Sequence, residues 1–192
     1  MQIPKHVISV WPKKHGGISD AVVKLTIGGA ISIFPVKLAK GKGGLHLCLP
    51  KTDSVIKEHR FPVQFIDSKA KKQIARNIEK TYRSNKSTCR EFDGDRQMYI
   101  DYFIFPKRIP FGQVATAVLE INQVIRIRGF RLAEYQDGHR TLFFPERFIK
   151  INGDYDFQRV VDFQNDWTEI ITSEIWRAYD EEIVRRQRKE VR

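Results

Sequence analysis

Clustered lysine and arginine side chains are the residues of this chain best suited to chemistry, and that chemistry is the binding of phosphate. The 192 residues include 34 Lys and Arg against 23 Asp and Glu, which gives a formal net charge of +11. Residues 1–83 hold 16 basic and 5 acidic side chains, 84–97 hold three of each, and 98–192 hold 15 of each. An excess of this size indicates a polyanionic partner, most often nucleic acid; the alternative is that it serves solubility alone.

Phosphate contacts need basic side chains that can be reached from one surface. The first part of the chain supplies them in a loop, in a glycine-rich turn, after a proline and along a predicted helix. The candidate binding residues there are Lys13, Lys14, Lys40, Lys42, Lys51, Lys69, Lys72 and Arg76. The alternative for the helical set is a solvated helix face.

The second part carries basic residues among acids at 154–174 that would repel phosphate. Arg126 and Arg128 share a strand face by the period of two. Arg131 lies on the opposite face unless Gly129 makes a bulge. The basic chain end is either a solvated helix end or a phosphate clamp. The candidates in this part are Arg126, Arg128, Arg147, Arg185 and Arg186.

The sequence predicts no catalytic residues, metal site or cofactor. Residues 40–44 lack the spacing and the Ser/Thr of a phosphate-binding P-loop. The five histidines are dispersed, and none has metal-ligand spacing with a cysteine or carboxylate. Trp11, Phe34, Phe105 and Phe130 could stack on bases, although their spacing along predicted strands favours a place in the core.

The stretch from Ile31 to Pro50 predicts the hairpin around which these residues are arranged. Apolar residues recur at roughly every second position on both arms, and three glycines between Lys40 and Leu45 suit a tight turn. Strands are also predicted at 7–11 and 21–27, with a turn at Gly28-Gly29, and an edge strand within 58–66.

A helix is predicted to begin at Asp67 or Ser68, either of which can serve as N-cap. Ala70, Ile74, Ile78 and Tyr82 then form one apolar stripe that would pack on the sheet. The polar stretch 84–97 is interpreted as a linker, because no apolar periodicity is present there.

The pattern occurs twice along the chain. Ile125–Ala133 matches Ile31–Ala39, and Phe105 matches Trp11, at a constant shift of 94 residues. The helix positions Ile74, Ile78 and Tyr82 match Ile171, Ile175 and Tyr179 at a shift of 97. A constant shift across several elements indicates a duplicated unit, with the insertions confined to loops.

The segment 31–50 resembles the SpoVG family, that of stage V sporulation protein G. Val36-Lys37-Leu38 stands at an Ile-Arg-Val-like segment of that family, and residues 44–50 stand at its Gly-Leu-Phe-Val-Ala-Met-Pro motif. His59-Arg60, Asp67 and Asn152-Gly153 resemble further family positions. The resemblance implies a small sheet with one packed helix, a homodimer, and DNA or RNA binding linked to gene regulation and septation. Since the family has a single unit, a tandem copy resembles a covalent pseudo-dimer, and the family's Ser-Lys-Arg loop is less basic in both copies here.

These observations predict an α+β protein of two similar units, 1–83 and 98–192, joined by the linker 84–97. Each unit is expected to be a mainly antiparallel sheet of four or five strands with one C-terminal helix, packed as a pseudo-dimer. We expect a non-enzymatic, nucleic-acid-binding regulator, with DNA favoured over RNA and the first unit as the main contact. The alternative is a protein-interaction module, such as one encoded by a mobile element, that engages a host protein.

Cysteine content and hydropathy indicate the cellular compartment of the protein. Cys48 and Cys89 are the two cysteines, and a disulfide between them is not expected. No apolar run approaches the ~20 residues of a membrane helix. We therefore expect a cytoplasmic protein without a membrane partner, present as a monomeric pseudo-dimer or a homodimer.

Overall fold

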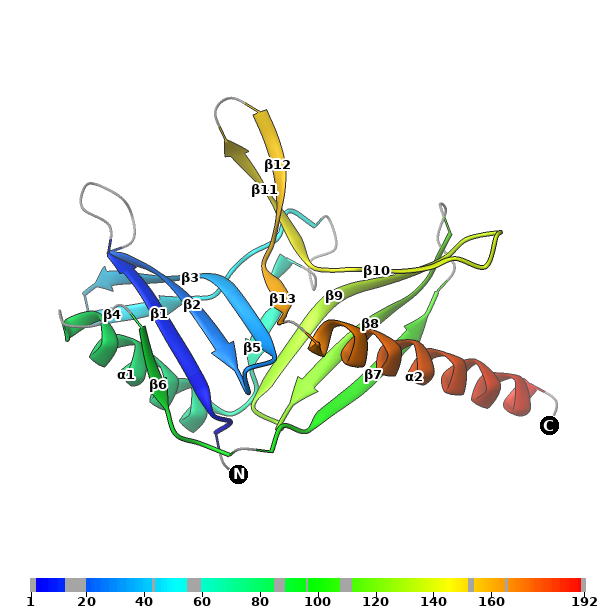
Figure 1. The fold of residues 1–192 in the computed structure, drawn as a ribbon, viewed down its shortest axis with the longest axis horizontal. Helices are drawn as coiled ribbons and strands as arrows, with labels where there is room; N and C mark the ends of the chain where they lie inside the picture. The colour runs from blue at the N-terminus through cyan, green and yellow to red at the C-terminus, as the bar shows by residue number, and fades with distance from the viewer. Residues whose placement is uncertain are drawn as a thin grey trace.

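The computed structural model describes residues 3–12, 20–42, 44–54, 60–84, 89–95, 97–107, 112–151, 154–164 and 166–190. These residues form two larger sheets, a two-stranded ribbon and two helices, one of them at the C-terminal end (Figure 1). Strands within each sheet pair antiparallel. The fold is therefore the mainly antiparallel α+β class that the sequence predicts.

The first sheet is built mainly from the N-terminal half of the chain. Its strand order is β13-β3-β2-β1-β6, and β4 pairs with the far end of β3. Apolar residues at alternate positions of β1 and β2 are buried on one face, where helix α1 packs. The elements are β1 (His6–Pro12), β2 (Ala21–Ile27), β3 (Ile31–Gly41), β4 (Gly44–Cys48), β6 (Cys89–Phe92), β13 (Val161–Phe163) and α1 (Ser68–Arg83).

The second sheet is built mainly from the C-terminal half. Its order is β10-β9-β8-β7, and β5 pairs with β9. Helix α2 packs across β7 and continues past it toward the C-terminus (Figure 1). The elements are β5 (Val63–Phe65), β7 (Ile100–Pro106), β8 (Gln113–Ile121), β9 (Ile125–Glu134), β10 (Arg140–Phe143) and α2 (Trp167–Glu190).

A two-stranded ribbon projects away from both sheets (Figure 1). It consists of β11 (Glu146–Ile151) and β12 (Asp154–Arg159), paired from Glu146 opposite Arg159 to Ile151 opposite Asp154. The sequence analysis did not predict these strands.

One short strand from each half pairs with the sheet of the other half. Val63 of β5 lies opposite Ile127 of β9, and Val161 of β13 lies opposite Ile33 of β3. The sequence predicts a fifth strand near Val63 but places it in its own unit, so this expectation is corrected. A three-residue strand carries too little side-chain pattern to specify its neighbour, which is set by tertiary packing.

One continuous hydrophobic core runs through both sheets and beneath both helices. The predicted helix stripe is confirmed for Ile74 and Ile78, and for Ile171, Ile175 and Tyr179 at the second helix, all of which are buried. Tyr82 is partly buried against the same core. No helix in the described part of the chain is long and apolar enough to cross a membrane.

Local sequence signals fix the start of α1 and the turns between strands. Asp67 is the N-cap, and its carboxylate accepts a hydrogen bond from the Ala70 backbone N–H at 2.7 Å. Gly28 and Gly29 adopt φ of 59° and 70° in the predicted turn, where a glycine has no steric penalty. Asn122 and Gln123 adopt the same left-handed conformation 94 residues later.

The stretch 84–97, interpreted as a linker, contributes strand β6 at the edge of the first sheet. Its Phe92 stacks on the buried His6 of β1, with 5.4 Å between ring centroids. His6 Nδ1 donates to the Pro4 carbonyl at 2.9 Å, and its Nε2 accepts from Asn77 of α1 at 3.1 Å. Burial lowers the pKa of His6 below its ordinary value. The hydrogen bond between Asn77 and His6 therefore links α1 to β1, and Phe92 of β6 covers the His6 ring.

Candidate nucleic-acid interface

Helix α1 presents a stripe of cations on the face opposite the core. With 3.6 residues per turn, positions 69, 72, 76, 80 and 83 lie on one side of the helix. At a rise of 1.5 Å per residue they extend over about 21 Å of its length. Their side chains are exposed, whereas Ile74 and Ile78 point into the core. We call Lys69, Lys72, Arg76, Lys80 and Arg83 the α1 stripe.

The cations of the α1 stripe are largely unopposed. Glu79 is the sole acid of this helix, and it forms an ion pair with Arg83 at 2.6 Å. Among the described residues, Lys69, Lys72, Arg76 and Lys80 have no ion-pair partner. Lys69 and Lys71 also lie in the first turn, where the helix dipole disfavours positive charge, whereas Lys80 and Arg83 lie in the last turn, where it favours positive charge. Helix stability therefore does not explain the cations near the start of α1.

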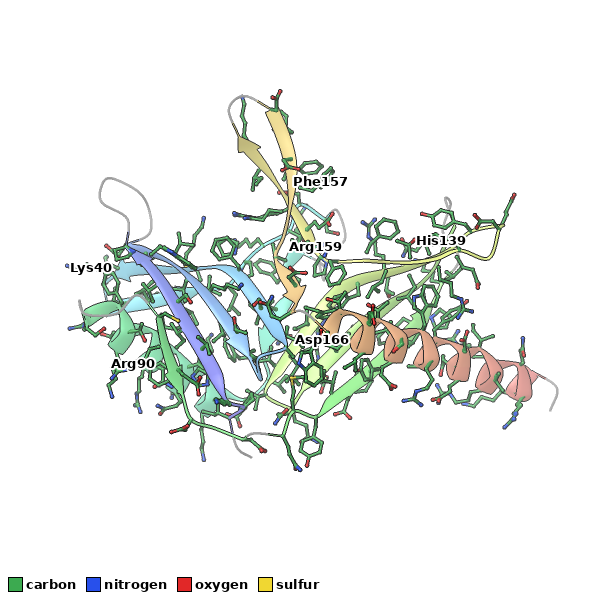
Figure 2. All side chains as sticks on the ribbon, in the orientation of Figure 1. Lys40, Arg90, His139, Phe157, Arg159 and Asp166 are labelled. Atoms are coloured by element: carbon green, nitrogen blue, oxygen red, sulfur yellow. The ribbon has the colours of Figure 1, made fainter. Side chains whose placement is uncertain are left out.

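Further cations lie at the end of the molecule where α1 terminates. Arg90 of β6 joins Arg76, Lys80 and Arg83 around a wide, open hollow. Lys40 lies near the exposed tip of the β3–β4 hairpin, at the same end as Arg90 (Figure 2), and the exposed Lys42 follows in the turn. Lys51 stands apart, with its ammonium 5.1 Å from the centre of the Phe61 ring. Lys13 and Lys14 lie outside the described residues.

The arginines of β9 share one sheet face. Thr116 lies opposite Arg131 and Glu120 lies opposite Arg126, with a register shift between them where Gly129 has a φ of 92°. The bulge that the sequence left open is therefore present. Arg126 forms an ion pair with Glu120, and Arg128 donates a hydrogen bond to Gln64 of β5 at 3.0 Å. The Arg131 guanidinium lies over the Phe143 ring.

The remaining candidates of the second half are also engaged by neighbours. Arg147 of the ribbon donates from Nε to Gln158 at 2.9 Å, and burial lowers the pKa of its guanidinium. Arg185 and Arg186 lie within α2 and pair with Glu182 at 2.6 and 2.9 Å. The hydrogen bond from Arg186, followed by that from Arg185, lowers the pKa of Glu182. Glu182 neutralises cations that would otherwise face phosphate, whereas the uncharged Gln158 only orients the Arg147 side chain.

The structure thus brings together part of the predicted set. Lys69, Lys72 and Arg76 share a face with Lys80 and Arg83, which the sequence analysis left out of the candidates although their helical spacing was available. Arg90 was missed because β6 was not predicted. The second-half candidates lie on other surfaces, on β9, the ribbon and α2.

Two aromatic residues expected in the core are exposed. Trp11 is 48% and Phe105 is 53% exposed, at equivalent positions of β1 and β7. Phe130 is fully buried, as predicted, and Phe34 is half-buried beside Trp11. The correction follows from sheet geometry, because residues at alternate positions face away from the helix. On the ribbon, Phe148, Tyr155 and Phe157 are also exposed.

The described residues contain no cluster of three or more potential metal ligands. Cys48 and Cys89 are not joined in a disulfide. Ser9 donates a hydrogen bond to the Cys89 sulfur at 3.4 Å.

Comparisons with models of protein families, with curated proteins and with solved structures give no match to this chain.

Proposed function

We propose that the chain is a tandem duplication folded as a pseudo-dimer with exchanged strands. The support is reciprocity at matched positions. The Phe34 N–H donates to the Val160 carbonyl at 3.0 Å, and the Arg128 N–H donates to the Pro62 carbonyl at 2.7 Å. Phe34 and Arg128 are 94 residues apart, and Pro62 and Val160 are 98 apart. A two-fold relation between the halves accounts for both bonds at once.

The same reciprocity recurs at a second pair of bonds. The Ile66 N–H donates to Val124 at 2.8 Å, and the Gln164 N–H donates to Ala30 at 2.7 Å. Strand exchange of this kind is a common route from a monomer to a symmetric dimer. The resemblance to the SpoVG family, which implies a homodimer of single units, supports the same arrangement.

Within this arrangement we propose a non-enzymatic, nucleic-acid-binding protein with a regulatory role, DNA being favoured over RNA. The observation that carries the proposal is the α1 stripe. Four of its cations have no ion-pair partner among the described residues, whereas the candidate cations of α2 are paired with acids. Binding to phosphates would release counterions from the nucleic acid, which makes unopposed cations on one surface effective.

The second candidate function is a protein-interaction module. The observation in its favour is the ribbon, where the tilted rings of Phe148 and Phe157 contact each other, with 4.5 Å between their centroids, while each is more than half exposed. Clustered exposed aromatic residues are typical of protein-binding surfaces. The ribbon also includes three acids, Glu146, Asp154 and Asp156, so it lacks the charge excess of the α1 stripe.

Binding isotherms with labelled duplex DNA, single-stranded DNA and RNA at two salt concentrations test the proposal. Replacing Lys69, Lys72 and Arg76 together by Glu should abolish binding to duplex DNA, because it removes three cations that would otherwise neutralise phosphates. The unfolding midpoint should stay unchanged because these side chains are exposed.

The control replaces Arg126, Arg128 and Arg147 by Gln, and it is compared with an α1 variant in which Lys69, Lys72 and Arg76 are replaced by Gln, so that each variant loses three positive charges. A larger loss of affinity in this control than in the α1 variant would contradict the site. If the wild-type protein binds none of the three nucleic acids at low salt, the protein-interaction function replaces the proposal.

A further inference from the structure

The outer face of the first sheet, on the side away from α1, carries an aromatic site that the α1 stripe does not use. Ile8 and Val10 of β1 are buried toward α1, so Trp11 faces the other way. Its ring meets Phe34 of β3 edge to face, with centroids 6.0 Å apart. Phe34 supports one edge of the indole, and nearly half of the Trp11 surface remains open.

A hollow of about 240 Å³ adjoins this ring pair. Lys24 of β2 lines it from one side, and Arg159 and Gln164, which flank β13, line it from another. The volume lies below the ~300–1,000 Å³ of sites that enclose a whole cofactor. It therefore suits one flat group lying partly in solvent rather than an enclosed ligand.

The charges around the ring pair favour a polyanion. Asp162 also borders the hollow, but Arg159 pairs with it at 3.2 Å. Lys24 and Lys37 both lie on this outer face, and neither has an ion-pair partner among the described residues. An open aromatic ring with neighbouring cations is the combination that binds unpaired bases, whose faces stack while the phosphates meet the cations.

We propose that Trp11 and Phe34, with Lys24, form a stacking site for single-stranded nucleic acid, separate from the α1 stripe. The base faces of a duplex are stacked on one another and cannot contact Trp11, so this site should bind single strands in preference to a duplex. Because the sheet lies between the two surfaces, the site neither requires nor excludes duplex binding by α1.

The second sheet provides a natural comparison at the equivalent position. Phe105 of β7 corresponds to Trp11 and is similarly exposed. Val118 stands at the position of Lys24, and Arg126 is neutralised by Glu120. Arg131 stands at the position of Lys37, with its guanidinium over the Phe143 ring. The smaller ring and the missing lysine make this face a weaker platform.

The experiment measures binding of oligo(dT), oligo(U) and a DNA duplex to the full chain. Trp11→Ala should lower affinity for both single strands about tenfold or more, and leave duplex affinity within twofold. Trp11→Phe should retain most of the single-strand affinity. Phe105→Ala, the matched control, should cause a smaller loss. Trp11→Ala should keep the wild-type unfolding midpoint within a few degrees.

Fluorescence gives a readout that a merely structural role would not change. Oligo(dT) should quench the tryptophan emission of the wild-type protein, and the quenching should disappear in Trp11→Phe, which retains Trp167 and Trp176. Quenching that persists in Trp11→Phe, or a Trp11→Ala variant with unchanged single-strand affinity, overturns the inference. The charge-reversed α1 variant tests the other surface separately, since it should lose duplex binding and keep the quenching.

Discussion

Helix α1 packs on β1 of the first sheet and helix α2 packs on β7 of the second, yet the two helices arrange their charges differently. Helix α2 begins with an acid, Glu169, and ends with Arg188 and Lys189, as the helix dipole favours. Its Arg177 pairs with Glu174 and Glu181, three and four residues away. Helix α1 has no acid in its first turn, and among the described residues it forms a single ion pair, between Arg83 and Glu79.

The difference teaches that a count of cations does not locate a binding surface. In α2 the side chains of Arg177, Arg185 and Arg186 each pair with an acid of the same helix, which stabilises the helix modestly and leaves little positive potential around them. In α1 most of the cations have no such acid among the described residues, so neighbouring cations repel one another, and Lys69 and Lys71 also oppose the dipole at the start of the helix. A partner that brings phosphates would remove that penalty, and this contrast is the physical basis of the proposed function.

The largest expected effect concerns the buried isoleucines through which both helices pack on their sheets. Ile74→Ala and Ile171→Ala should each lower the free energy of unfolding by about 2–5 kcal/mol, because each removes a fully buried side chain. Exchanged strands and a continuous core also predict one cooperative transition for both variants. Urea unfolding followed by far-UV circular dichroism and tryptophan fluorescence measures both quantities.

Ile170→Ala is the control for that series, since Ile170 is 49% exposed on α2. It should cost less than about 0.5 kcal/mol. Two separate transitions in Ile74→Ala, with only one half unfolding first, would contradict the pseudo-dimer.

A smaller effect comes from exchanging the charge patterns of the two helices. Ser68→Glu places an acid three and four residues before Lys71 and Lys72, as Glu182 stands before Arg185 and Arg186. It should weaken duplex DNA binding about threefold and reduce the salt slope by about 1. Glu182→Gln should release two arginines and strengthen binding by a similar factor.

Both variants are measured in one titration series at matched salt, with Ser68→Gln as the uncharged control. If Ser68→Glu and Ser68→Gln bind equally well, local neutralisation is not what separates the two helices.

The smallest effect concerns how each helix is attached to its sheet. Asn77 of α1 donates to His6, whereas Glu174 and Ile100 stand at the matching positions of the second half. The folded state lowers the pKa of His6, so the unfolded state binds more protons just below the ordinary value near 6.5. The contribution of His6 to the free energy of unfolding should therefore be fully present at pH 7 and should decrease as the pH falls toward 5.

Thermal unfolding across this pH range measures the effect, and His6→Gln should flatten it. Asn77→Asp offers a sharper control, because a carboxylate beside Nε2 would favour the charged imidazole. A wild-type midpoint that rises between pH 7 and pH 5 while His6→Gln stays flat would disprove the assignment.

Much of the fold and part of the site could be predicted from sequence. Periodicity placed Ile74, Ile78, Ile171 and Ile175 in the core, and Asp67 at the start of α1, because these depend on contacts a few residues apart. Helical spacing likewise predicted that Lys69, Lys72 and Arg76 lie on the side of α1 opposite the core.

Sequence by itself therefore determined the repeated residue pattern and the charge excess of residues 1–83. Tertiary structure decided that β5 pairs with β9 and β13 with β3, that Arg90 joins the α1 stripe, and that Trp11 faces solvent. Strand alternation defines two faces of a sheet, but both faces of β1 carry apolar side chains, so the pattern alone does not say which face a helix covers. Helix α1 packs on the face of β1 that includes His6, through Asn77 and the buried Ile74 and Ile78. This packing leaves Trp11 exposed on the opposite face.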